Sequence, residues 1–126
     1  MEVLAGRVLL RPRDPGRTLA FYRDVLGLAI FREFPGGTVF FLGGGYLEVS
    51  GSAPGNGVPG AAAVWLQVRD LAAAHAELVA RGAEVWRPPR REPWGLDEMW
   101  LADPDGTPVV VVEVPPEHPM RRDPRQ

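Results

Sequence analysis

The chain has 126 residues, 45% of them hydrophobic, and a formal net charge of −2. This length suits one compact domain, and no apolar run approaches the ~20 residues that cross a membrane. The absence of cysteine excludes disulfides, thiolate nucleophiles and cysteine-based zinc sites. All 14 basic residues are arginine, which also excludes lysine Schiff-base chemistry.

The charge pattern argues against two classes of partner. The arginines are scattered along the chain and form no basic stripe, so we expect no nucleic-acid partner. We expect no membrane partner either. The first residues lack the pattern of a secretion signal, and a cytoplasmic location is the default expectation.

The first half of the chain predicts a strand, a helix and three further strands. An apolar strand at 7–14 ends at Asp14, which is a suitable helix N-cap with Pro15 behind it. Apolar residues then recur at helical spacing until Gly27, a suitable C-cap. Short strands separated by glycine-containing turns follow at 28–34, 38–42 and 46–50.

The second half repeats this order. A strand ends at Asp70, a helix follows, and Gly82 stops the helix. Three strands follow, at 83–89, 97–102 and 107–114. We therefore expect a single domain over 1–126, with a first repeat at about 3–50, a Gly/Pro-rich linker at 51–60, a second repeat at about 61–114 and a tail at 115–126.

Each repeat has one helix to cover one face of its sheet, and the other face needs a partner. We expect an α+β fold in which two βαβββ modules form a curved mixed sheet around a shared concave pocket.

Two segments carry a resemblance to a known family. The stretch "FYRDVLGLAIF" at 21–31 and the turn "DPDG" at 103–106, within half-repeats of this order, resemble the vicinal oxygen chelate superfamily, which comprises glyoxalases, bleomycin-resistance proteins and dioxygenases. The resemblance covers about residues 3–114. Both metal enzymes and metal-free binding proteins share this scaffold. The "PWG" stretch at 93–95 resembles bleomycin-resistance-like, metal-free members.

The resemblance implies four metal-ligand positions, one on each of four strands. In this sequence they are Arg7, Glu48, Ala63 and Val110. A guanidinium has no lone pair to offer a metal, and alanine and valine have no donor atom. Only Glu48 retains a ligand, so we expect no metal and no cofactor.

Other acids and histidines do not replace the missing ligands. Glu113 stands three residues beyond Val110, which places it on the opposite face of the strand, facing solvent or a strand neighbour. His75 reads as a packed or half-exposed helical residue, and His118 lies in the tail.

Tryptophans are the candidates for the wall of a metal-free pocket. Trp65 lies two residues after Ala63 and therefore on the same strand face. Trp94 belongs to the "PWG" stretch. Trp100 and Trp86 lie on strands that could pair in either of two registers, so their facing stays open.

Arginines on the first strand are the candidate polar groups. Arg7 and Arg11 share a strand face because their separation is even. In glyoxalase I relatives, the position of Arg11 resembles one that contacts a substrate carboxylate. An inward Arg7 needs an acidic partner, and Glu48 is the candidate; the alternative is that both arginines reach solvent.

Two classes of function remain. The first is a metal-independent small-molecule-binding protein, antibiotics being one ligand class, with a ligand site at Arg7, Arg11, Glu48, Ala63, Trp65, Trp94, Trp100 and Val110. The alternative is a divalent-metal-dependent glyoxalase, lyase or dioxygenase that uses Glu48. A metal-free isomerase with Glu48 as general base lacks an acid partner in the sequence. We expect a homodimer in either case.

Overall fold

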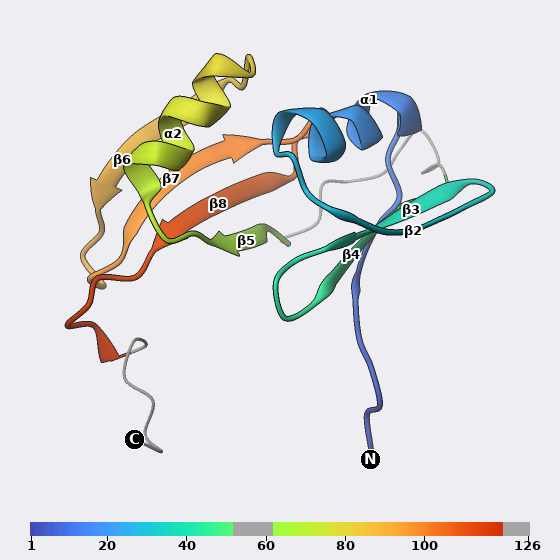
Figure 1. Cartoon of the computed structure of the whole chain (residues 1–126), viewed down its shortest axis with the longest axis horizontal. Coiled ribbons are helices and arrows are strands. Elements are labelled where there is room, and N and C mark those ends of the chain that lie inside the picture. Colours follow the sequence, from blue (N-terminus) through green and yellow to red (C-terminus); the bar gives the residue numbers. More distant parts are fainter. Residues whose placement is uncertain (52–61, 120–126) are drawn as a thin grey trace. The chain divides into compact units, whose positions relative to one another are not determined.

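A computed structural model describes residues 1–51 and 62–119 (Figure 1). The chain folds into two compact units. The first unit holds residues 1–60 and 103–106, and the second holds residues 61–102 and 107–126. Apart from Gly51, the predicted linker lies outside the described residues, as does the tail from residue 120.

The first unit is a four-stranded sheet with one helical segment. Its strand order is β1-β4-β3-β2, with β1 parallel to β4 and the other pairs antiparallel. The elements are β1 (Val8–Leu10), α1 (Pro15–Ala20), the π-helical η1 (Phe21–Val25), β2 (Ile30–Phe34), β3 (Gly37–Phe41) and β4 (Tyr46–Ser50).

The predicted helix start is confirmed. Asp14 has an extended backbone, and its Oδ1 accepts a hydrogen bond from the backbone N–H of Arg17 at 3.1 Å. Pro15 opens the helix, where its missing N–H costs nothing. The strand predicted at 7–14 is shorter than expected, because only Val8–Leu10 pairs with β4.

The "DPDG" turn packs within the first unit. Asp103 is buried and accepts a 2.8 Å hydrogen bond from the hydroxyl of Tyr22, which is also buried. Burial raises the pKa of Tyr22, and the charge of Asp103 adds to this. The carboxylate of Asp105 accepts from the backbone N–H of Arg13 at 3.0 Å. Gly106 closes the turn with φ 86°, a conformation that favours glycine.

The second unit repeats the topology of the first. Its strand order is β5-β8-β7-β6, with β5 parallel to β8. Asp70 caps the helix by accepting from the backbone N–H of Ala73 at 3.0 Å. The elements are β5 (Val64–Gln67), α2 (Leu71–Ala80), β6 (Val85–Arg91), β7 (Asp97–Ala102) and β8 (Pro108–Glu113).

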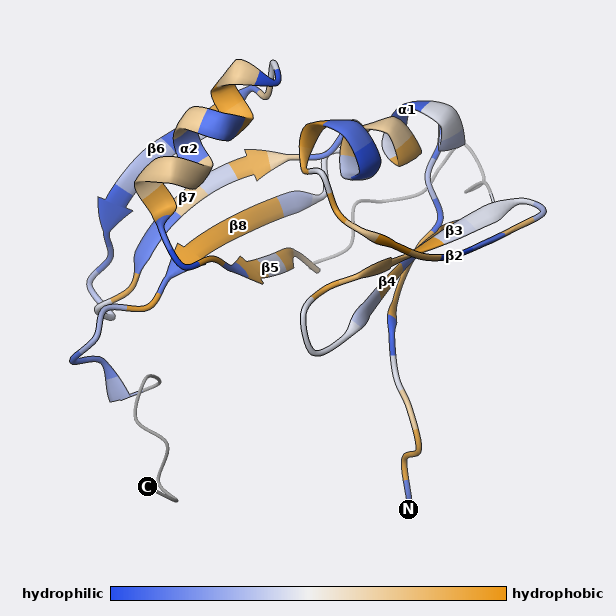
Figure 2. Ribbon diagram, viewed as in Figure 1, coloured by the Kyte–Doolittle hydropathy of each residue, from blue (hydrophilic) through white to orange (hydrophobic). Residues whose placement is uncertain are grey.

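The two faces of the second sheet follow from the pairing of β8. Glu113 contacts the backbone of α2, so the odd-numbered residues of β8 face the helix. Val109 and Val111 are buried on that face with their partners on β7. Figure 2 shows β8 as hydrophobic along most of its length. The even-numbered residues, Val110 and Val112, point to the face without a helix, which we call the helix-free face.

These observations confirm the α+β fold with two βαβββ modules. Pro88 and Pro89 lie in β6, which is an edge strand and can therefore lack ladder donors. Within residues 1–51 and 62–119, no helix has the length and hydropathy of a membrane span.

Candidate functional site

Glu48 on β4 is held by two neighbouring side chains. Nη1 of Arg7 donates to Oε1 of Glu48 at 2.8 Å, and the hydroxyl of Ser50 donates to Oε2 at 2.7 Å. The side chain of Glu48 is 18% exposed and that of Arg7 is 42% exposed. The predicted ion pair is therefore confirmed, and both carboxylate oxygens have a donor.

The neighbouring groups stabilise the ionised form of Glu48. The hydrogen bond from Ser50 lowers the pKa of Glu48, and the bond and charge of Arg7 and the charge of Arg11 lower it further, against the opposing effect of partial burial. Arg11 lies beyond the end of β1, and its Nη1 would be 2.8 Å from a Cβ placed on Gly51. The guanidinium thus lies against the Gly51 backbone at the end of β4.

An aromatic cluster lies on the same face of the first sheet as Glu48. Tyr46 precedes Glu48 by two residues and is the register partner of Phe41. The ring of Phe31 lies 5.1 Å from that of Phe41 and 4.8 Å from that of Tyr46, between centroids. Sequence reasoning missed this cluster, because Phe31 lies at a register shift of β2 that no spacing rule reveals.

Four residues of the second unit form a row across its sheet. Trp65 on β5 pairs with Val110 on β8, Val110 pairs with Trp100 on β7, and Trp100 pairs with Arg87 on β6. Register partners share a face, so this row lies on the helix-free face. The open question of how Trp100 faces is settled: it lies on the same face as Trp65 and Val110. Trp65 is 44% exposed.

A buried acid joins two of the predicted tryptophans. Glu98 on β7 is 5% exposed. Its Oε2 accepts from Nε1 of Trp94 at 2.7 Å, and its Oε1 accepts from Nε1 of Trp100 at 3.0 Å. Sequence reasoning missed Glu98, although its even separation from Trp100 places both on one strand face.

Arg87 stacks on Trp100. Its guanidinium carbon lies 3.4 Å from the ring centroid, and the same guanidinium forms an ion pair with the buried Glu92. Burial lowers the pKa of Arg87, as does the charge of Arg90, while the charge of Glu98 opposes the change. Trp86 lies at the first register shift of β6, between Val85 and Arg87, and is exposed.

Three further residues have roles that the structure makes explicit. Glu113 points away from Val110, as the parity argument predicted, but the expectation of solvent or a strand neighbour was wrong. Its Oε1 accepts from the backbone N–H of Leu71 at 2.8 Å, at the first turn of α2. His75 is half-buried on α2, as predicted. Nε2 of His118 lies 3.1 Å from the carbonyl oxygen of Trp94, so this part of the tail packs against the "PWG" turn.

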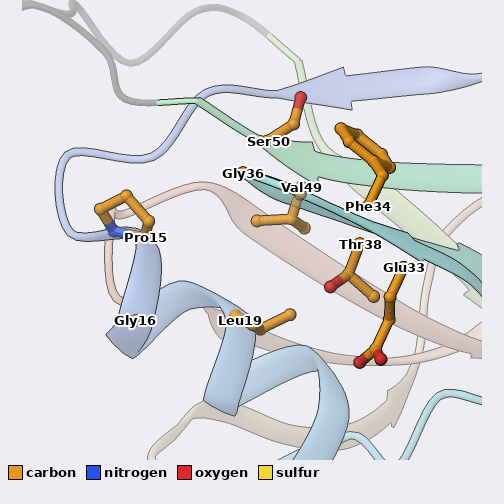
Figure 3. Close-up of a pocket in the computed structure, with 10 residues that line it drawn as sticks. Pro15, Gly16, Leu19, Glu33, Phe34, Gly36, Thr38, Val49 and Ser50 are labelled. Carbon is orange, nitrogen blue, oxygen red and sulfur yellow. The ribbon is translucent and has the colours of Figure 1, made fainter.

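A cavity of about 410 Å³ lies elsewhere in the first unit (Figure 3). It opens between α1 and strands β2 to β4, where Leu19 faces Val49 and Thr38. Val49 points into the cavity from the face of β4 opposite to Glu48, whereas Ser50, which donates to Glu48, also lines the cavity at the end of β4. None of the residues predicted for the ligand site lines it.

The donor set does not fit a divalent metal. Ala63 is exposed just before β5, and Val110 lies in β8, so neither position offers a ligand atom. Arg7 brings a positive charge to Glu48. Over the described ranges, no three His, Cys, Asp or Glu side chains come together as a metal site.

The sequence model of the Glyoxalase/Bleomycin resistance protein/Dioxygenase superfamily matches residues 5–111. The chain belongs to this superfamily. Among the solved structures that resemble it is a glyoxalase/bleomycin resistance protein/dioxygenase from Nocardioides, at 19% identity and a TM-score of 0.73, covering 94% of this chain and 89% of that one.

Two other similar structures carry different names. A lactoylglutathione lyase from Agrobacterium tumefaciens is 24% identical, with a TM-score of 0.69 and coverage of 90% of this chain and 94% of that one. TioX from Micromonospora sp. ML1 is 22% identical, with a TM-score of 0.69 and coverage of 87% and 95%. No curated protein matches the chain. At these identities the structures share the fold, and fold alone does not assign an activity.

Proposed function

We propose that this superfamily member is a metal-independent small-molecule-binding protein of the bleomycin-resistance-like branch. The observation that carries the proposal is the Arg7–Glu48–Ser50 cluster, in which both oxygens of the one retained acid have donors. A divalent cation would have to displace the guanidinium of Arg7 and approach the charge of Arg11.

In this proposal each unit offers its own binding surface, which is the sheet face of Glu48 in the first unit and the helix-free face in the second. Phe31 and Phe41 in the first unit, and Trp65 and Trp94 in the second, are 39–54% exposed. Aromatic rings give large apolar contact areas with defined stacking geometry, and a few polar groups such as Arg7 and Arg11 then orient a ligand. We infer that the protein acts without a cofactor and in the cytoplasm. We also infer that it is a homodimer, because two-fold pairing would cover edge strands such as β1 and β5.

Metal titration tests the first half of the proposal. Purified protein is titrated calorimetrically with Zn²⁺, Ni²⁺ and Mn²⁺, and its metal content is measured without exposure to chelators. We expect wild type and Glu48→Gln to bind equally little metal. Arg7→His is the matched variant, because it returns an imidazole beside Glu48 and should gain measurable Ni²⁺ affinity. A stoichiometric metal in wild type that Glu48→Gln loses would instead support a metal-dependent lyase, isomerase or dioxygenase.

Ligand titration tests the second half. A panel of aromatic and cationic compounds, bleomycin included, is screened by quenching of tryptophan fluorescence. All four tryptophans fall between residues 61 and 102, so the signal reports on the second unit. Trp65→Ala should weaken a hit about tenfold through lost stacking and apolar contact. Trp86→Ala, which removes an exposed indole outside the row of Trp65, Val110 and Trp100, should leave it unchanged. A flat response across the panel would refute small-molecule binding.

A further inference from the structure

The cavity between α1 and strands β2 to β4 meets the Glu48 cluster only at Ser50, among the residues that the structure describes. Its volume is about 410 Å³, within the range of roughly 300–1,000 Å³ that is typical of small-molecule sites. All the residues that line it belong to the first unit, whereas the four tryptophans belong to the second. A ligand in this cavity would therefore bind without contact to an indole of the second unit's sheet.

A row of three register partners forms the sheet side of the cavity. Glu33 on β2 pairs with Thr38 on β3, and Thr38 pairs with Val49 on β4. Register partners share a face, and Leu19 projects from α1 toward this row (Figure 3). Pro15 and Leu19 are four residues apart and so lie on one side of α1. The periods of strand and helix thus direct all these side chains into one space.

Polarity changes from the floor of the cavity to its rim. Val49 and Thr38 form the floor and are each 3% exposed. Leu19 is half-buried, and Glu33 is exposed at the rim. Of the lining residues that the structure describes, Glu33 alone carries a charge. This order suits a ligand that inserts an apolar body and keeps a charged group close to solvent.

A tight contact fixes the end of the cavity at the β2–β3 hairpin. A Cβ placed on Gly37 would lie 2.5 Å from Cζ of Phe34 and 2.6 Å from Cβ of Ser50. The absence of a side chain at Gly37 therefore lets the Phe34 ring close against β4. The guanidinium carbon of Arg32 lies 5.2 Å from the centroid of that ring and holds it from outside. The wall is thus formed before a ligand arrives.

The carboxylate of Glu33 is open to a ligand cation. None of the ion pairs in the described part of the chain includes Glu33. Arg23 is engaged by Asp24, to which its Nε and Nη2 donate at 2.8 Å; these bonds are the main cause that raises the pKa of Arg23, and Glu33 adds to it. The rim is therefore complementary to a cationic group and unfavourable to an anion.

We propose that this cavity is a second ligand site, which takes a compact aliphatic ammonium compound. The apolar body packs against Leu19 and Val49, and burial of this area supplies most of the affinity. The ammonium group lies beside Glu33 at the rim, and the hydroxyl of Thr38 offers one polar contact at the floor. Because the floor is aliphatic, a rounded aliphatic body fits it without aromatic stacking. This site goes beyond the function proposed above and does not depend on it.

The test uses 1-adamantanamine, a rounded aliphatic amine that is protonated at neutral pH, as the probe. The comparator, 1-adamantanecarboxylate, has the same shape and the opposite charge. Binding to the full chain is measured by calorimetry and in assigned ¹H–¹³C methyl spectra. We expect the amine to move the methyl resonances of Leu19, Val49 and Thr38 and to leave those of Val110, in the second unit, unchanged. The amine should bind at least about threefold more tightly than the carboxylate.

Glu33→Gln and Glu48→Gln are the matched pair of variants, because each removes one carboxylate from the first sheet, on opposite faces. Glu33→Gln should weaken binding of the amine about threefold, the effect of losing one exposed ion pair. Glu48→Gln should leave the affinity for the amine unchanged. Leu19→Phe, at a half-buried position that tolerates a larger ring, should weaken binding about tenfold because the ring takes up part of the cavity.

Unmoved methyl resonances of Leu19, Val49 and Thr38 throughout a millimolar titration would overturn the second site. Equal affinity in wild type and Glu33→Gln, or a preference for the carboxylate, would overturn the ligand class. Shifts at Val110, or binding lost in Glu48→Gln, would place the amine at the surfaces of the proposed function and overturn the second site. The tryptophan response to the aromatic panel tests the proposed function separately, so a flat panel with amine bound in the cavity would refute that function alone.

Discussion

Among single residues, Glu48 links the chemistry of the site to pH. Its folded-state pKa is lowered by the Ser50 hydroxyl and then by Arg7 and Arg11. A lowered pKa means that the stabilising contribution is complete above the ordinary value of 4.5 and is lost as pH falls through the folded-state pKa. Ser50→Ala should move the pKa of Glu48 upward, which a carboxyl ¹³C titration by NMR detects directly.

Urea unfolding at several pH values measures how much the ionised form of Glu48 contributes to stability. The difference in unfolding free energy between wild type and Ser50→Ala should be largest above pH 4.5 and should shrink in acid, because protonated Glu48 gains less from the hydroxyl. Arg7→Met should show the same sign through the loss of the ion pair. A free-energy difference that is independent of pH would contradict this assignment.

At the level of elements, α2 is capped from two directions. Asp70, the residue before the helix, accepts from the N–H of Ala73. Glu113, at the end of β8, accepts from the N–H of Leu71. Glu113→Ala should lower the free energy of unfolding by about 1–2 kcal/mol, since it removes an N-terminal acceptor and a favourable charge at the helix dipole. Thermal or urea unfolding measures the loss. An unchanged stability, or a loss of ligand binding, would argue against a purely structural role for Glu113.

The same element shows what the sequence predicts and what it does not. Asp14 and Asp70 were predictable as caps, because an N-cap contact spans only three residues of chain. The parity of Glu113 and Val110 was predictable from the strand period. The partner of Glu113 was not, because it depends on where α2 crosses the sheet. The facing of Trp100 was not predictable either, because it follows from the register in which β7 pairs with β8, where Trp100 lies opposite Val110.

For the candidate site, the sequence predicted several of the residues, but most of their hydrogen-bond partners are visible only in the folded structure. The resemblance placed both Arg7 and Glu48 at ligand positions of one site, so their ion pair could be anticipated, and the even spacing added Arg11 to the strand face of Arg7. The part played by Glu98 could not, because its two indole partners come from a turn and a strand whose side chains converge only in the folded sheet. Buried polar networks of this kind depend on three-dimensional geometry rather than on spacing.

At the level of the whole molecule, the "DPDG" turn belongs to one unit by sequence position and to the other by packing. Residues 103–106 connect β7 to β8 along the chain, yet they pack as part of the first unit. The hydrogen bond from Tyr22 to Asp103 joins residues 81 positions apart and is buried at both ends. We expect the two units to unfold in one cooperative transition, because the connection between β7 and β8 folds only with residues of the first unit.

Tyr22→Phe tests this expectation, since it removes one hydroxyl and keeps the ring. A hydrogen bond to a buried charged group contributes about 1.5–3 kcal/mol, so the variant should lose a comparable amount of unfolding free energy. Both tyrosines lie in the first unit and all four tryptophans in the second, which makes tryptophan fluorescence a probe remote from the change. In Tyr22→Phe, the urea midpoint measured by tryptophan fluorescence should fall together with the midpoint measured by far-ultraviolet circular dichroism. Tyr46→Phe is the control, because Tyr46 lies at the half-buried start of β4, and it should shift both midpoints less. A fluorescence transition that stays at the wild-type midpoint while the dichroism transition shifts would show that the two units unfold independently.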